Sequence, residues 1–303
     1  MLGYLKRRYN NHLNKVLSTI KLIDVEERYD LHFSRFYGLY FANAAKWMKM
    51  TPTQVSIISL VLGVFGGALF YYQGNFWIAA LGGFLVTWAG VLDSADGQLA
   101  RMTGQSSELG RQIDGLIDNL VFISCYIGGT LYLIPQYGYW VFILMVAAGL
   151  AHSYKAGLYE FYKSEYLYLV GKSDAGHIPL SIDEIKPTGS KWHHKIMHYI
   201  NLDYTGKQIR STTRSAEDRK RMRELSRNQA DKFDPLYSKW NFEMLFWWAW
   251  LGGSNTHRNA MVISALFGRF DIYLAASLIW TIGYLPLNIM QRRYDQKLLK
   301  ELT

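Results

Sequence analysis

Residues 76–118 read FWIAALGGFLVTWAGVLDSADGQLARMTGQSSELGRQIDGLID, and a second apolar run follows at 119–134. The part Phe76–Leu92 carries no charge and approaches the roughly 20 apolar residues that a helix needs to cross a bilayer. Since hydrocarbon tolerates only backbone whose polar groups are paired within the segment, such a run predicts a transmembrane helix. Comparable runs are Val55–Tyr72, Tyr139–Ala151 continuing toward Tyr162, Phe242–Gly268 and Ile272–Met290. The sequence therefore predicts an all-α, polytopic membrane helix bundle with six transmembrane helices, the fifth of them interrupted at Gly252–Asn255.

The composition agrees with a membrane protein. Half of the 303 residues are hydrophobic and 19% are charged, against about 25% in soluble domains. A mean hydropathy near zero indicates that apolar blocks alternate with strongly polar ones. The single cysteine, Cys125, has no partner for a disulfide within the chain, which excludes a small disulfide-stabilised scaffold.

The placement of charge predicts the orientation in the membrane. The 33 Lys and Arg residues outnumber the 24 Asp and Glu residues, which gives a formal charge of +9. The proposed outer connections Gln73–Asn75 and Pro135–Gly138 contain no Lys or Arg, and Gly268–Asp271 contains only Arg269. Because basic residues accumulate on the cytoplasmic side, both termini are expected in the cytoplasm. The positive charge is then an orientation signal, and this argues against a nucleic-acid partner.

The same patterns divide the chain into four parts. Residues 1–50 form a cytosolic segment whose apolar and basic residues recur at helical spacing, as in an interfacial amphipathic helix or a helix packed on the protein's own cytosolic face. Residues 51–165 hold transmembrane helices 1–4, and residues 166–238 form a cytosolic insertion between helices 4 and 5. Residues 239–303 hold helices 5 and 6 and a basic tail. Within the insertion, Thr212–Ala230 predicts a charged helix.

Four acidic residues flank the connection between the second and third apolar runs. Asp93 and Asp96 are spaced i,i+3, and Asp114 and Asp118 are spaced i,i+4, so each pair shares a helix face. A short connection folds the two helices antiparallel, which lets the four carboxylates meet. At the edge of a low-dielectric medium they would repel one another unless protons or cations neutralised them. Hard oxygen ligands favour magnesium, manganese or calcium over zinc, and a cluster of this size can hold two divalent ions.

Small residues and one arginine lie between the two acidic pairs. Gly97, Ala100 and Gly110 would let a bulky ligand approach the helix backbone. Arg101 offers a fork of donors suited to phosphate oxygens. Together with metal ions, these residues indicate a nucleotide diphosphate as the ligand.

The resulting string, D-x-x-D-G-x-x-A-R-x8-G-x3-D-x3-D over 93–118, resembles the signature of the CDP-alcohol phosphotransferase family of membrane enzymes at every fixed position. The resemblance implies transfer of a phosphate-linked alcohol from a CDP-alcohol to a second alcohol, with release of CMP. It implies that Asp93, Asp96 and Asp114 coordinate two Mg²⁺ or Mn²⁺ ions. It further implies that Asp118 both binds metal and acts as the catalytic base toward the acceptor hydroxyl.

The resemblance also assigns the donor site. The residues that would line the site of the CDP moiety are Asp93, Gly97, Ala100 and Arg101. One departure lies before the first span, where the family usually has Asn after Pro52 and this chain has Thr53. Thr51 and Pro52 also suit a helix cap and a first helical turn, without any contact to the donor.

The resemblance leaves several substrates open. Six spans without further helices, and the cationic Lys155, favour CDP-diacylglycerol as donor and inositol, inositol phosphate, glycerol phosphate or serine as acceptor. Transfer of the CDP-choline or CDP-ethanolamine type onto a lipid alcohol is the alternative within the family. An ion or proton transporter would explain the aspartates but not the small residues and the arginine between them. The family also implies a homodimer, and the motif and the absence of a disulfide favour a prokaryotic inner membrane.

Weaker candidates lie further along the chain. His152 and Lys155 fall toward the cytosolic end of the fourth span, where Lys155 could neutralise a phosphorylated acceptor or extend to the membrane interface. His257 and Arg258 follow the interruption of the fifth span and could line an acceptor cavity or mark the end of a helix. Three histidines have spacing compatible with a metal but read better as a solvated loop. They are His193, His194 and His198.

Overall fold

The computed structural model describes residues 2–20, 22–105, 108–186 and 192–302, and the side chains at 2–9, 108–114, 175, 193, 194, 196 and 197 lie outside that description. Every regular element within these ranges is a helix, which confirms the all-α prediction. The chain divides into two compact units. Unit 1 comprises Met1–Gly149 and His257–Ala276, and unit 2 comprises Leu150–Thr256 and Ser277–Thr303.

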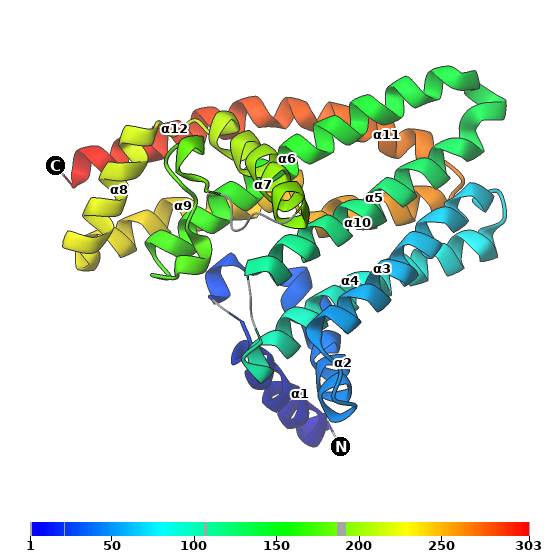
Figure 1. Ribbon diagram of the computed structural model, residues 1–303, viewed down its shortest axis with the longest axis horizontal. Helices are drawn as coiled ribbons and strands as arrows, with labels where there is room; N and C mark the ends of the chain where they lie inside the picture. The colour runs from blue at the N-terminus through cyan, green and yellow to red at the C-terminus, as the bar shows by residue number, and fades with distance from the viewer. Residues whose placement is uncertain (1, 21, 106–107, 187–191, 303) are drawn as a thin grey trace. The chain divides into compact units, whose positions relative to one another are not determined.

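Unit 1 is built around three long helices, α3, α4 and α5, which run side by side (Figure 1). The helix α2 packs against α4 as well. The helices that supply residues to this unit are α1 (Leu2–Leu17), α2 (Arg35–Trp47), α3 (Pro52–Leu69), α4 (Phe76–Thr103), α5 (Glu108–Tyr137), α6 (Val141–Leu169), α10 (Ser254–Leu266) and α11 (Phe270–Trp280). Shorter helical turns lie at Ile23–Val25, Asp30–Ser34, Phe70–Tyr72 and Gly138–Trp140.

Glycine residues let α3 approach both α4 and α5 closely. A Cβ atom on Gly66 of α3 would lie 2.8 Å from the Gly82 carbonyl oxygen of α4. A Cβ atom on Gly128 of α5 would lie only 2.2 Å from the Gly67 carbonyl oxygen of α3. Any larger side chain would push these helices apart, and small residues at helix contacts are typical of membrane bundles. The close packing holds α4 and α5, the two helices that carry the acidic motif, against α3.

The cap of α3 places its beginning at the predicted residues. The Gln54 backbone N–H donates to the Thr51 hydroxyl at 3.3 Å, and the Thr51 N–H donates to the Gln54 side chain at 2.8 Å, with Pro52 in the first turn. This reciprocal capping box satisfies two backbone donors that the helix itself cannot pair. The capping role predicted for Thr51 is thus confirmed. The side chain of Thr53 is exposed.

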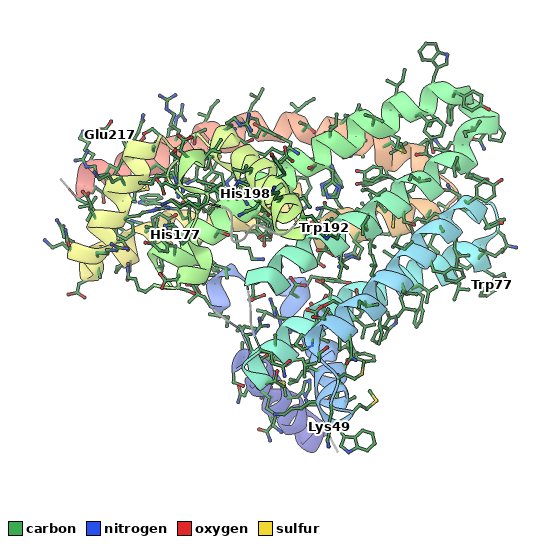
Figure 2. All side chains as sticks on the ribbon, in the orientation of Figure 1. Lys49, Trp77, His177, Trp192, His198 and Glu217 are labelled. Carbon is green, nitrogen blue, oxygen red and sulfur yellow. The ribbon has the colours of Figure 1, made fainter. Side chains whose placement is uncertain are left out.

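The two ends of the α3–α4 pair differ in character. Lys49 lies just before α3, and Trp77 lies in the first turn of α4 at the opposite end of the pair (Figure 2). Trp77 is 79% exposed, as suits an aromatic anchor at a membrane interface. Since α4 runs away from Trp77, its acidic residues lie at the end where α3 begins. The left-handed Gly104 (φ +68°) ends α4 at this side.

Four helical segments among the described residues are long and apolar enough to cross a membrane: Pro52–Tyr72, Phe76–Thr103, Gly115–Leu169 and Phe270–Glu301. The third contains the turn at Gly138–Trp140 and therefore includes both the third and the fourth predicted spans. The predicted fifth span is absent from this set, because α9 ends at Gly252 and α10 is a separate helix of 13 residues. The number of six transmembrane helices stays a prediction, as does the four-part division of the chain.

The N-terminal region folds back on the rest of unit 1. In α1, the His12 ring stacks on Tyr40 of α2 at 4.2 Å, and His12 Nε2 lies 2.8 Å from the Phe36 carbonyl oxygen. Val16, near the end of α1, is fully buried. The described half of α1 therefore packs on the protein itself, which was one of the two predicted arrangements. A position of α1 at the membrane interface stays a prediction.

Unit 2 contains the cytosolic insertion and the helices beside it. The elements of this unit, in addition to the later part of α6, are α7 (Trp192–Ser211), α8 (Ala216–Asn228), α9 (Ala230–Gly252) and α12 (Tyr284–Glu301), with turns at Asp174–Gly176, Ile182–Glu184 and Thr281–Gly283. The helix α8 lies within the stretch predicted as a charged helix, and the Ser215 hydroxyl caps it by accepting from the Asp218 N–H at 3.0 Å. Both α8 and α12 pack against α9.

Buried ion pairs hold unit 2 together. Arg214 donates from Nε and Nη2 to the two carboxylate oxygens of Asp295 at 2.9 and 2.8 Å. Arg219 and Arg223 both donate to Glu165 Oε1 at 3.1 Å. Burial disfavours the charged form of Arg214, but the Asp295 carboxylate more than offsets this and raises the pKa of Arg214 above its usual range. The charged insertion is therefore fixed to α6 and α12 by these contacts.

Candidate active site

The acidic residues of α4 lie one helical turn apart at the motif end of unit 1. Asp96 is buried, with 3% of its surface exposed, and its Oδ2 accepts a hydrogen bond from the Ser56 hydroxyl of α3 at 2.7 Å. Asp93 precedes it by one turn and is partly exposed. A carboxylate buried in this way is stabilised only by donors or cations around it. Ser56 is one such donor, and no motif or spacing in the sequence points to it.

Asp118 on α5 contacts an arginine from a distant part of the chain. Its Oδ1 accepts a hydrogen bond from Arg258 Nη2 of α10 at 3.4 Å. Asp118 keeps 32% of its side chain exposed, whereas the Arg258 side chain is 8% exposed. The positive charge of Arg258 also interacts with Asp93 and Asp30. Asp118 of α5 and Asp93 of α4 therefore interact with the same buried cation, and the predicted meeting of all four carboxylates stays a prediction.

A glycine makes room for the Arg258 side chain. A Cβ atom on Gly90 of α4 would lie 2.1 Å from Arg258 Nη1 and 2.6 Å from its Cζ. No real side chain tolerates such a distance, so the guanidinium occupies the space that Gly90 leaves free. On its other side, Arg258 Cζ lies 5.8 Å from the centre of the Phe122 ring. The sequence analysis left the role of Arg258 open, and the structure places it among the motif residues.

Arg101 and Gly97 form a second part of the site. The guanidinium of Arg101 lies along the face of α4 that carries Gly97, where an added Cβ atom would be 3.4 Å from Arg101 Nη1. Arg101 Nε donates to the Thr19 carbonyl oxygen, while Nη2 is buried and has no hydrogen-bond partner among the described residues. Ala100 is partly exposed beside them. This face therefore offers a fixed cationic donor next to a position without a side chain.

The comparisons with known proteins agree with this geometry. Residues 49–162 match the family model of CDP-alcohol phosphatidyltransferase, a range that begins before α3 and includes the whole motif. The chain contains a CDP-alcohol phosphatidyltransferase domain. For residues 49–162 the match confirms the family predicted from the motif, and a domain of a membrane-enzyme family together with four long apolar segments supports an integral membrane protein.

Three relatives are similar to part of the chain. A protein of Aquifex aeolicus named bifunctional IPC transferase and DIPP synthase is 28% identical over 139 residues, which are 42% of this chain and 30% of that protein. A protein of the same name from Archaeoglobus fulgidus is 30% identical over 79 residues, 26% of this chain and 15% of that protein. The archaetidylinositol phosphate synthase of Pyrococcus horikoshii is 34% identical over 81 residues, 27% of this chain and 41% of that protein.

The match thus spans less than half the length of each of these relatives. No solved structure is significantly similar to the chain.

The donor atoms of the domain suit a hard divalent cation. Asp93, Asp96 and Asp118 supply carboxylate oxygens, which magnesium and manganese prefer, and Arg258 shows that two of them already face a positive charge. Among the described side chains, no group of three or more His, Cys, Asp and Glu residues is close enough to hold a metal ion. The side chain of Asp114, the remaining predicted ligand, lies outside the described part of the chain. The metal assignments of the four aspartates therefore stay predictions.

Two of the weaker candidates, Lys155 and His152, fall in unit 2. Lys155 is fully buried, and its ammonium donates to the Ser277 carbonyl oxygen at 2.6 Å. The Lys155 side chain therefore does not extend to a membrane interface, because its ammonium is bonded to Ser277 inside unit 2. His152 is also buried, with 6% of its surface exposed. Of the three histidines predicted to lie in a solvated loop, His198 is partly buried in the helix α7, and the side chains at 193 and 194 lie outside the described part.

Proposed function

We propose that the protein transfers a phosphatidyl-type group from a CDP-activated lipid to the hydroxyl of a phosphorylated small alcohol, and releases CMP. The preferred donor is CDP-diacylglycerol, and the preferred acceptor is an inositol phosphate. The observation that carries the proposal is the complete Asp93–Asp118 motif, whose acids of α4 and α5 face the buried Arg258. The name of the Pyrococcus relative, an archaetidylinositol phosphate synthase, supports an acceptor of the inositol phosphate class.

The reaction follows from the chemistry of the motif. The acceptor hydroxyl oxygen attacks the phosphorus that carries the lipid, and the bond from this phosphorus to the anhydride oxygen breaks. CMP leaves with the electron pair of that bond, and the hydroxyl proton passes to the Asp118 carboxylate. Asp118 suits the role of base because its carboxylate is partly exposed, whereas Asp96 is buried and bonded to Ser56.

The aspartates would hold the metal ions of the reaction. Asp93, Asp96, Asp114 and Asp118 would bind Mg²⁺ or Mn²⁺, which supplies positive charge to the diphosphate and to the CMP leaving group. Arg101 would bind phosphate oxygens of the donor with the nitrogen that has no protein partner. Gly97 and Ala100 would leave space for the nucleotide beside it.

Arg258 favours an acceptor that itself carries a phosphate. Its guanidinium is held next to Asp118, so an alcohol positioned for proton removal would have a cation nearby. Arginine binds phosphate through two parallel hydrogen bonds and remains charged in a buried site. A neutral alcohol would gain no comparable interaction. Lys155 and His152 stay candidates for acceptor binding on the basis of the sequence alone.

The test is an assay of CMP release by the purified protein in lipid nanodiscs with Mg²⁺. The donors are CDP-diacylglycerol and CDP-choline, and the acceptors are inositol phosphate, inositol, glycerol phosphate, serine and diacylglycerol. We expect turnover with CDP-diacylglycerol and a phosphorylated acceptor. Asp118→Asn should reduce turnover at least 100-fold and keep donor binding, since it removes the base but not Arg101.

Two outcomes would contradict the proposal. Turnover of Asp118→Asn at the wild-type rate would remove the role of this residue as base. Failure to release CMP from any donor would favour the transporter hypothesis, which can be measured as proton or cation flux into sealed vesicles. For the acceptor, Arg258→Gln should lower the preference for inositol phosphate over inositol, and an unchanged preference would assign the acceptor phosphate to another residue.

A further inference from the structure

The region between α1 and α2 packs against the motif face of α4. The Thr19 carbonyl oxygen accepts a hydrogen bond from Arg101 Nε. Gln98 Nε2 donates to the Thr19 hydroxyl at 3.1 Å and to the Arg35 carbonyl oxygen, also at 3.1 Å. Thr19 is 8% exposed and Gln98 is fully buried. Residues 16–20 and 22–35, called the wall segment below, are therefore bonded to the face of α4 that carries Gln98 and Arg101.

The contact with Thr19 orients the guanidinium of Arg101. A backbone carbonyl holds Nε, while Nη2 remains buried without a hydrogen-bond partner among the described residues. An unsatisfied buried donor is unfavourable, and a ligand oxygen would remove that penalty. Gly97 leaves the neighbouring position without a side chain. The held guanidinium thus presents an unused donor beside an open position on α4.

A second residue of the wall segment balances the charge around Arg101. Glu26 Oε2 accepts from Arg35 Nε at 2.6 Å, and the Glu26 side chain is only 5% exposed. Arg101 interacts electrostatically with Arg35, Glu26 and Asp96. The two arginines repel each other, and Glu26 offsets this repulsion. Removal of the Glu26 charge would leave two neighbouring cations and would favour displacement of the flexible Arg101 side chain.

A third residue of the wall segment interacts electrostatically with the other arginine of the site. The half-buried Tyr29 forms a hydrogen bond with the side chain of Asn259 on α10. It also interacts electrostatically with Arg258, the residue beside Asn259, and with Asp30. Tyr29 is therefore bonded to the same turn of α10 that brings Arg258 to Asp118. One short segment is therefore bonded to Arg101 and, through Asn259, to the turn that carries Arg258.

We propose that the wall segment is a positioning element of the reaction site, in which Thr19 and Glu26 orient Arg101 for the donor and Tyr29 orients Arg258 for the acceptor. The inference rests on the proposed function, in which these two arginines bind different substrates. The inference has a specific consequence. Changes at Thr19 or Glu26 should alter the affinity for the donor, whereas a change at Tyr29 should alter the affinity for the acceptor. A segment that only supported the fold would not separate the donor from the acceptor.

The experiment compares conservative variants of the full-length protein in nanodiscs. Thr19→Val removes the hydroxyl that accepts from Gln98 Nε2, and so loosens the attachment to α4 of the backbone whose carbonyl oxygen holds Arg101 Nε. Glu26→Gln removes a charge on the donor side, and Tyr29→Phe removes the hydroxyl on the acceptor side. We expect Thr19→Val and Glu26→Gln each to raise the KM for CDP-diacylglycerol about fivefold, with the acceptor KM and kcat unchanged within twofold. Tyr29→Phe should raise the KM for the phosphorylated acceptor by a similar factor and leave the donor KM unchanged.

Matched controls come from the same region. Ser18→Ala removes an exposed hydroxyl that bonds only locally to the Lys15 carbonyl oxygen, one residue before Thr19. Tyr37→Phe removes the hydroxyl of a tyrosine on α2 that is 40% exposed. Both controls should keep both KM values within twofold of the wild type. A control that shifts a KM as strongly as its test variant would overturn the assignment.

The remaining outcomes separate this inference from the proposed function. If both KM values changed equally in every variant, the wall segment would be only a structural support. The same conclusion would follow if only kcat and the melting temperature fell. If the wild type released no CMP from any donor, the proposed function would fail. Calorimetric binding of CDP in the presence of Mg²⁺ would then still test the donor side. An equal dissociation constant for the wild type, Thr19→Val and Glu26→Gln would overturn the inference.

Discussion

The space at Gly90 predicts that a single methyl group displaces Arg258. In Gly90→Ala the new Cβ atom would lie 2.1 Å from Arg258 Nη1, whereas atoms in ordinary contact are about 3.5 Å apart. The guanidinium must therefore retreat by about 1.4 Å. If the guanidinium moves directly away from Asp118, the distance from Arg258 Nη2 to Asp118 Oδ1 grows from 3.4 Å to about 5 Å.

The energetic effect follows from Coulomb's law. At an effective dielectric constant of about 20, the attraction between unit charges falls from about 5 to about 3.5 kcal/mol over this change. The difference of about 1.5 kcal/mol corresponds to a factor of about ten in rate or affinity. Displacement of a group beside the reacting atoms adds to this, since a shift of about 1 Å can cost up to about 100-fold. We therefore expect kcat/KM of Gly90→Ala to fall between about 10- and 100-fold.

The assay is CMP release in nanodiscs, with the melting temperature measured on the same samples. Gly149→Ala is the matched control, because a Cβ atom there meets nothing within 4 Å and alanine is the better helix former. A double-mutant cycle with Arg258→Gln shows whether the effect acts through Arg258. In that background Gly90→Ala should have little further effect. Wild-type activity of Gly90→Ala, or additive losses in the double variant, would refute the reasoning.

Three other changes test neighbouring parts of the structure. Ser56→Ala removes the hydroxyl bonded to Asp96, which is a proposed metal ligand. The Mg²⁺ concentration for half-maximal activity should therefore rise about 10- to 100-fold in a metal titration. An unchanged Mg²⁺ concentration would contradict the role of Ser56 in supporting Asp96. Gly97→Ala adds a Cβ atom at 3.4 Å from Arg101 Nη1, which is an ordinary contact distance, so the melting temperature should stay unchanged. The KM for the donor should rise, because the Cβ atom occupies space proposed for the nucleotide. An unchanged donor KM would show that the nucleotide binds elsewhere. Arg214→Met leaves the buried Asp295 carboxylate without its arginine and should lower the free energy of unfolding by about 3–5 kcal/mol in denaturant unfolding, and wild-type stability would contradict this account.

The local features of the site were predictable from the sequence because they depend on short spacings. The i,i+3 and i,i+4 intervals place Asp93 with Asp96 and Asp114 with Asp118 whatever the rest of the chain does. The capping box at Thr51 depends on a residue only three positions away. The apolar runs likewise required nothing beyond length and composition, and the all-helical fold followed from them.

The contacts that complete the site could not be predicted in this way. Arg258 lies 140 residues from Asp118, and Arg101 lies 82 residues from Thr19. Such pairs depend on the order in which helices pack, and a periodic pattern within one helix carries no information about it. A lone arginine in an apolar stretch is a signal of function, but it does not name its partner. The role of Gly90 likewise depends on a distant residue, because its missing side chain leaves the space that the Arg258 guanidinium occupies.

The structure also changes the meaning of the charge in the insertion. The net positive charge of the chain, to which this region contributes, is interpreted from the sequence as an orientation signal. Arg214 and Arg219 each have 1% of their side chain exposed and bond to Asp295 and Glu165, so they act in packing. A buried, paired arginine contributes little to the attraction of a segment to an anionic surface, because its partner cancels its charge at a distance. The argument for cytosolic termini therefore depends on the short connections, where Gln73–Asn75 lacks basic residues altogether, rather than on the insertion.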